Sequence, residues 1–121
     1  MEVDVRTQGD ENDKLSAVII VDLRGRLVSG VGDELLREVT NELLAEGWKR
    51  ILFNLTGVSK IDSSGIGELV AGVKLAERFE SSVKVLLSGG RVRDVLELSQ
   101  LLPRLDVYEV EAEAIASFGD V

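Results

Sequence analysis

Residues 51–67 decide the fold, because the spacing of apolar side chains changes within them; they read Ile-Leu-Phe-Asn-Leu-Thr-Gly-Val-Ser-Lys-Ile-Asp-Ser-Ser-Gly-Ile-Gly. Residues 51–55 alternate as in a β-strand. Further along, apolar residues recur at helical spacing, namely at Ile66, Leu69, Val70, Val73 and Ala76. The change of period falls at Asp62-Ser63-Ser64-Gly65. The sequence therefore predicts a strand, a turn and then a helix that begins at the two serines.

Ser63 is predicted to stand at the entrance of this helix. The first amide groups of a helix lack intrahelical acceptors and carry the positive end of the helix dipole. Such a position suits an anion, including a phosphate made on the serine itself. The alternative is an ordinary N-cap serine, whose oxygen accepts an amide hydrogen bond. Because Asp62 can supply that cap, we expect Ser63 to face solvent.

Two glycines follow within the first helical turns, at positions 65 and 67. Each reduces helix stability by ~1 kcal/mol relative to alanine. We expect them to allow a partner surface or a kinase to approach the backbone closely. Their spacing fits neither a Rossmann nor a P-loop pattern, and no lysine follows, so a nucleotide-binding loop is disfavoured.

Other hydroxyls and cations have simpler interpretations. Ser64 is expected to point into the junction of helix and sheet rather than to be a second phosphorylation site. Thr56 and Ser59 are interpreted as exposed residues of the loop before the motif. The stretch Ser88-Gly-Gly-Arg91, with Arg93 after it, is interpreted as a strand-to-helix turn with solvated arginines.

Residues 62–67, preceded by a strand that ends in Asn54-Leu55, resemble the signature of the STAS family, specifically its single-domain bacterial anti-sigma factor antagonists. A weaker similarity lies in residues 21–27, Val-Asp-Leu-Arg-Gly-Arg-Leu, which look like the family's second strand and its exit turn. The resemblance spans roughly residues 17–118. Residues 87–93 depart from the family pattern, because two glycines and two arginines replace a turn rich in small apolar residues.

The resemblance implies a switch. Ser63 matches the serine that a partner kinase phosphorylates, and the residues that it implies for partner binding are Asp62, Ser63, Ser64, Gly65, Ile66 and Gly67. The implied partner is an anti-sigma factor with serine kinase activity, bound only while Ser63 is unphosphorylated, so that a sigma factor is released. A PP2C-type phosphatase is a further implied partner. The alternatives are a stressosome-type or transporter-linked STAS subunit, or a nucleotide-binding STAS module.

The composition restricts the chemistry. The chain of 121 residues is 45% hydrophobic and 30% charged, which predicts one globular domain over residues 1–121. It contains no cysteine and no histidine, which excludes Ser-His-Asp triads, Cys-His dyads and nearly every zinc site. An enzyme acting through Asp62 and Ser63 would lack a base to activate the serine. We therefore expect neither catalysis nor a cofactor or metal.

The charge restricts the partners. Acidic residues outnumber basic ones by 22 to 14, and the net charge of −8 disfavours nucleic acids and anionic membrane surfaces. No apolar run approaches the ~20 residues that span a bilayer, and the first residues lack the features of a signal peptide. The expected location is the cytoplasm.

The order of elements predicts an α/β fold, with a mixed sheet of four to five strands and about four helices that cover mainly one face, the arrangement that the STAS resemblance also implies. The middle strands are expected to be parallel and the first hairpin antiparallel. Strands are expected at residues 3–5, 15–23, 51–55, 83–87 and 106–110. Helices are expected at residues 31–44, 66–76, 92–99 and 112–118.

Overall fold

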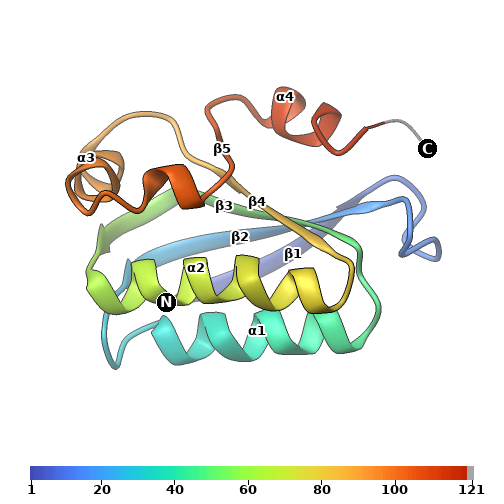
Figure 1. Ribbon diagram of the computed structural model, residues 1–121, viewed down its shortest axis with the longest axis horizontal. Helices are drawn as coiled ribbons and strands as arrows, with labels where there is room; N and C mark the ends of the chain where they lie inside the picture. The colour runs from blue at the N-terminus through green and yellow to red at the C-terminus, as the bar shows by residue number, and fades with distance from the viewer. Residues whose placement is uncertain (120–121) are drawn as a thin grey trace.

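Five strands form one mixed sheet in the order β1-β2-β3-β4-β5 (Figure 1). The computed structural model describes residues 1–119. The strands are β1 (Glu2–Gln8), β2 (Val18–Leu27), β3 (Arg50–Ile61), β4 (Ser82–Leu86) and β5 (Val107–Tyr108). β1 is antiparallel to β2, and every later pair of neighbours is parallel. The predicted hairpin followed by parallel strands is confirmed.

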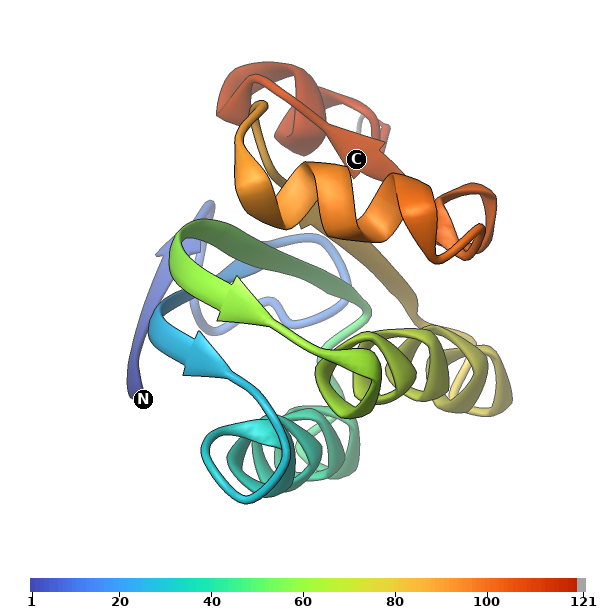
Figure 2. The same cartoon turned by 90° about the vertical axis from the view of Figure 1, so that its left-hand side faces the viewer.

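The helices cover mainly one face of this sheet, as predicted. They are α1 (Asp33–Ala45), α2 (Ser63–Arg78), α3 (Arg91–Leu98) and α4 (Glu111–Ala116). α1 and α2 lie side by side along the sheet (Figures 1 and 2), and buried residues of α3 join the same core. α4 packs on the opposite face. Within residues 1–119, no helix combines the length and the hydropathy needed to cross a bilayer.

The central strands bury both of their faces. In β2, Ile19, Val21 and Leu23 belong to the large core shared with α1, α2 and α3. Val18 and Ile20 point the other way, into a smaller core that includes Ala114 of α4. Strands covered on both faces have continuous rather than alternating apolar sequence. This two-sided burial explains the apolar run at residues 18–21.

The central strands β2 and β3 differ from their predicted ranges. β2 begins only at Val18, because Leu15 lies in the preceding turn with 68% of its surface exposed. Both β2 and β3 continue beyond the predicted ends, to Leu27 and Ile61, and they pair there through two register shifts. Gly25, which lies beyond the predicted end of the strand at residue 23, is therefore part of β2. The extra pairing carries the sheet directly to the residue before Asp62.

Smaller differences occur at helix boundaries. The sequence pattern predicts Val31 on the first helix, but this residue bridges to Val28 instead, and α1 begins at Asp33. Gly47, with φ of +95°, follows the end of α1 in the left-handed conformation that is typical of a glycine past a helix C-terminus. The last strand and the last helix are shorter than predicted, at Val107–Tyr108 and Glu111–Ala116.

Candidate functional site

The candidate site lies at the carboxyl ends of the parallel strands β2 and β3. Figure 2 views the molecule from this side, with the arrowheads of both strands toward the reader and α2 starting next to them. β3 ends at Ile61, Asp62 follows in extended conformation, and α2 begins at Ser63. The sheet therefore places the predicted motif at one edge of the molecule.

Asp62 caps α2 and also holds the loop that precedes α1. Its Oδ1 accepts a hydrogen bond from the Gly65 amide at 3.1 Å, and its Oδ2 accepts one from the Ser29 amide at 2.9 Å. These donors, the Ser29 amide first, hold the pKa of the Asp62 carboxyl below its usual value of 3.8, because they stabilise the ionised form. Asp62 is thus an ionised residue with a donor on each oxygen.

Ser63 occupies the first position of α2, and its side chain is exposed. The capping bond to Gly65 comes from Asp62, so Ser63 is not the N-cap, as expected from the sequence. Ser64 is half-buried at the junction of helix and sheet. Of the two serines of the motif, Ser63 is consequently the more exposed.

Gly65 and Ile66 contribute to the interior. A Cβ on Gly65 would overlap the carbonyl oxygen of Leu27 and would lie only 3.0 Å from the Ile61 side chain. Ile66 is 3% exposed and belongs to the large core. The expectation that Gly65 admits a partner is therefore corrected, because the glycine permits close packing of α2 against the end of β2. Gly67 is exposed, and a Cβ added to it would have no neighbouring atom within 4 Å.

Three other sequence interpretations need correction. Thr56 and Ser59 lie in β3 rather than in a loop, and the Ser59 hydroxyl donates to the Gly25 carbonyl at 3.2 Å. Arg93 is half-buried and not simply solvated. It bonds to the Leu87 carbonyl and pairs with Glu97 and Glu109.

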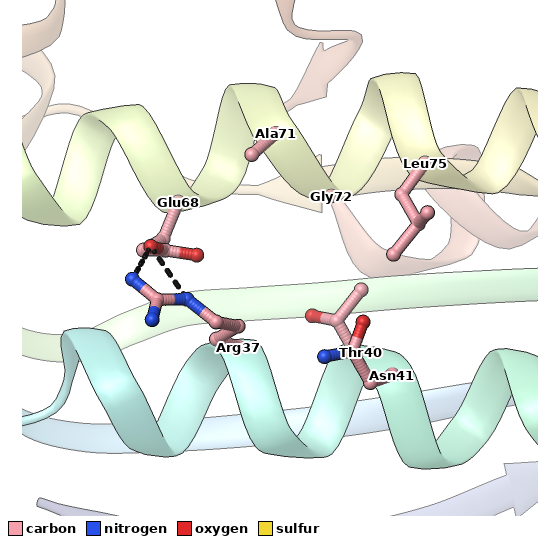
Figure 3. Close-up of a pocket in the computed structure, with 7 residues that line it drawn as sticks. All are labelled: Arg37, Thr40, Asn41, Glu68, Ala71, Gly72 and Leu75. Carbon is pink, nitrogen blue, oxygen red and sulfur yellow. Dashed lines mark hydrogen bonds and ion pairs between the residues drawn. The ribbon is translucent and has the colours of Figure 1, made fainter.

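A shallow pocket, which no motif of the sequence indicates, lies between α1 and α2 near the site (Figure 3). Arg37 of α1 and Glu68 of α2 form an ion pair in it, and Ala71 and Leu75 supply apolar surface. Residues 63, 67, 71 and 75 recur every four residues and so share one stripe of α2. Gly72 faces Thr40 of α1 in this pocket, and a Cβ added to it would make an ordinary contact with the Thr40 side chain, 3.4 Å from Cγ2.

Among residues 1–119, the acidic residues do not gather into a metal site. In the part of the chain that the structure describes, no three His, Cys, Asp or Glu side chains are grouped so as to hold a metal ion.

Solved structures of other proteins have a fold similar to that of this chain. The protein TM1081 from Thermotoga maritima superposes with a TM-score of 0.76 and 22% identity, over 93% of this chain and 92% of that one. An anti-sigma factor antagonist from Mycobacterium paratuberculosis gives a TM-score of 0.76 and 17% identity, over 96% and 93%. The Bacillus cell fate determinant SpoIIAA in its phosphorylated form gives a TM-score of 0.63 and 21% identity, over 96% of this chain and 100% of that one.

At these identities the likeness shows a shared fold. The sequence itself matches the family model described as STAS domain over residues 8–114, nearly the whole chain. With its sheet, its helices and this match in agreement, the chain belongs to the STAS domain family.

Proposed function

We propose that this protein is an anti-sigma factor antagonist, switched off by phosphorylation of Ser63. Its membership of the STAS family and its likeness to solved antagonists support the first part. The likeness extends to SpoIIAA, which has been solved in unphosphorylated and phosphorylated forms. The observation that carries the second part is the division of roles at the start of α2, where Asp62 caps the helix and Ser63 is exposed.

In the unmodified protein, the accessible part of the motif is small. Ser63 presents a hydroxyl, and Gly67, one turn later, presents bare backbone. A partner can therefore approach the first turns of α2 without displacing a large side chain. We propose that this partner is an anti-sigma factor with serine kinase activity, and that its capture releases a sigma factor in the cytoplasm.

Phosphorylation would change this surface electrostatically. A phosphate adds about −1.5 to −2 charge at neutral pH. On Ser63 it would stand beside the ionised Asp62, in a protein whose net charge is already −8. Helix-start amides favour an anion by ~0.3 to 1 kcal/mol, so the fold tolerates the change. The new charge and bulk block the interface, and a PP2C-type phosphatase would restore it.

The alternative of an enzyme acting through Asp62 and Ser63 finds less support. Each oxygen of Asp62 accepts an amide hydrogen bond, so this carboxylate is already engaged with the backbone. The chain has no histidine to serve as the base instead. We therefore propose a binding role without a cofactor, in which Ser63 is a substrate of another protein.

Incubation with the cognate anti-sigma kinase and ATP tests the proposal. Intact mass spectrometry should show one added phosphate, and a peptide map should place it on Ser63. The Ser63→Ala variant should gain none, whereas the matched Ser64→Ala variant should be modified like the parent. Phosphate on Ser64, Thr56 or Ser59 would overturn the assignment, as would modification of Ser63→Ala.

A further inference from the structure

Three exposed cations stand together at the same edge of the molecule as Ser63. They are Arg26 at the end of β2, Lys60 at the end of β3 and Arg91 at the start of α3, and we call them the basic patch. Arg26 and Lys60 are opposite each other in the register of the two strands. Lys60 and Arg91 line the same hollow between β3 and α3. The three positions thus follow one another from β2 over β3 to α3, and Figure 2 faces the end of the molecule where β2 and β3 terminate.

The cations of the patch have no ion-pair partner among the residues that the structure describes. Within residues 1–119, none of its three side chains forms an ion pair, whereas Arg6, Arg24, Arg37, Lys84 and Arg93 all do. Two neighbouring hollows open at this edge, and neither has an aspartate or glutamate in its lining. Such an absence is notable in a chain with 22 acidic residues. Adjacent like charges repel, and an anionic partner would relieve that repulsion.

The hollows also offer apolar surface. Val92 lines both of them, Val58 lines one, and Val95 lines the other. Hydroxyl groups of Ser59 and Ser88 stand at their walls. A ligand that matches this surface combines several carboxylates with an apolar side chain. That combination is typical of an acidic peptide segment, and less so of a simple anion.

We propose that the basic patch is a docking surface for an acidic segment of a protein partner. Carboxylates of that segment contact Arg26, Lys60 and Arg91, and an apolar side chain enters the hollow beside Val92. The patch deepens the proposed function and rests on it, since Lys60 lies three residues before Ser63 and both residues stand at the same edge of the molecule. Complementary charge of this kind speeds association and selects partners. A nucleic acid fits less well, because the net charge of −8 repels a long polyanion.

Titration of the ¹⁵N-labelled protein with an acetylated peptide of Glu-Glu-Leu repeats, followed by NMR, tests the patch. Amide shifts are expected at residues 59–61 and 91–95. Neutralising two cations, in Lys60→Gln with Arg91→Gln, should weaken binding by roughly fivefold or more, and added salt should weaken the parent's binding similarly. The matched control is Lys74→Gln with Arg78→Gln, which removes the same charge from exposed positions on α2.

Several outcomes would overturn the proposal. One is equal weakening by both double variants, which would mean that only net charge matters. Another is the absence of shifts at the patch, or equal binding of a peptide with glutamine in place of glutamate. A third is displacement of the peptide by inorganic phosphate or a single-stranded oligonucleotide at lower concentration. None of these measurements involves the kinase or Ser63, so the patch and the phosphorylation switch can fail independently.

Discussion

Replacement of Gly65 by alanine tests the packing that positions Ser63. Gly65 is buried where α2 meets the end of β2. Its new methyl group would overlap the Leu27 carbonyl oxygen, and it would also lie 2.9 Å from Leu27 Cγ and 3.0 Å from Ile61 Cγ1. The closest obstacle is backbone in a strand, which cannot rotate away as a flexible side chain can. The start of α2 must therefore shift.

The expected magnitude combines two opposing effects. Overpacking a well-packed site costs about 1 to 3 kcal/mol, and a backbone obstacle favours the upper end of that range. Alanine in place of glycine in a helix gains at most ~1 kcal/mol. We therefore expect Gly65→Ala to lower the free energy of unfolding by about 2 kcal/mol.

Gly67 provides a matched control two residues further along. It lies in the same helix, is exposed, and has no atom within 4 Å of an added Cβ. Gly67→Ala should therefore raise the free energy of unfolding by about 0.5 to 1 kcal/mol, through helix propensity and a less flexible unfolded chain. The two substitutions are chemically identical and should change the free energy of unfolding in opposite directions.

Urea denaturation followed by circular dichroism measures both effects. With a slope of about 1 to 3 kcal/mol per molar urea, the midpoint of Gly65→Ala should fall by roughly 1 M. If Gly65→Ala proves as stable as Gly67→Ala, the close contact of α2 with Leu27 does not exist as described. In that case the origin of the position of Ser63 would have to be sought elsewhere.

Three further predictions concern Asp62, Ser63 and Asp22. Ser63→Ala should lower the free energy of unfolding by no more than ~1 kcal/mol in the same urea assay. Asp62→Ala should lower the urea midpoint further, because it removes two hydrogen bonds from backbone amides. If Ser63→Ala proved the more destabilising of the two, Ser63 would be the true N-cap. Ser63→Asp should fold normally yet bind the anti-sigma partner at least ~100-fold more weakly in calorimetry, and parent-like affinity would remove Ser63 from the interface. Hydrogen bonds, first from Arg6 and then from Asn54, lower the pKa of Asp22 in the folded protein below its usual value of 3.8. The ionised Asp22 therefore stabilises the fold at pH values above 3.8, and this contribution is lost as the pH falls through the folded pKa. Asp22→Asn should therefore lose less stability than the parent between about pH 5 and pH 3, and equal losses would contradict this.

Much of the fold could be predicted because local signals agreed with the tertiary arrangement. The change of period at residues 62–65 located the strand-to-helix transition, and the apolar run at residues 18–21 identified a strand that is buried on both faces. Asp62 was recognisable as a cap, because aspartate immediately before a helical pattern is a strong start signal. These features arise from residues that are close together in the sequence, so they can be recognised without the structure.

The roles of single residues were harder to predict when they depended on distant contacts. Residues 56–60 contain turn-forming types, yet they form a strand because the end of β2 supplies the pairing partner. Gly65 was expected to let an external partner approach the backbone. In the structure it packs instead against Leu27, nearly forty residues earlier in the chain. Arg93 was expected to be solvated, but the fold places Glu109 within ion-pair distance of it.

The sequence by itself determined that this chain forms an α/β domain with a serine at a helix start, since periodicity, capping and glycine positions are local properties. Only the tertiary structure decided which motif residues face solvent and which support the core. It also brought Arg26, Lys60 and Arg91 together, because strand register and helix packing join residues that no sequence spacing relates. Surfaces for partners depend on such non-local contacts, and for that reason the basic patch became visible only in three dimensions.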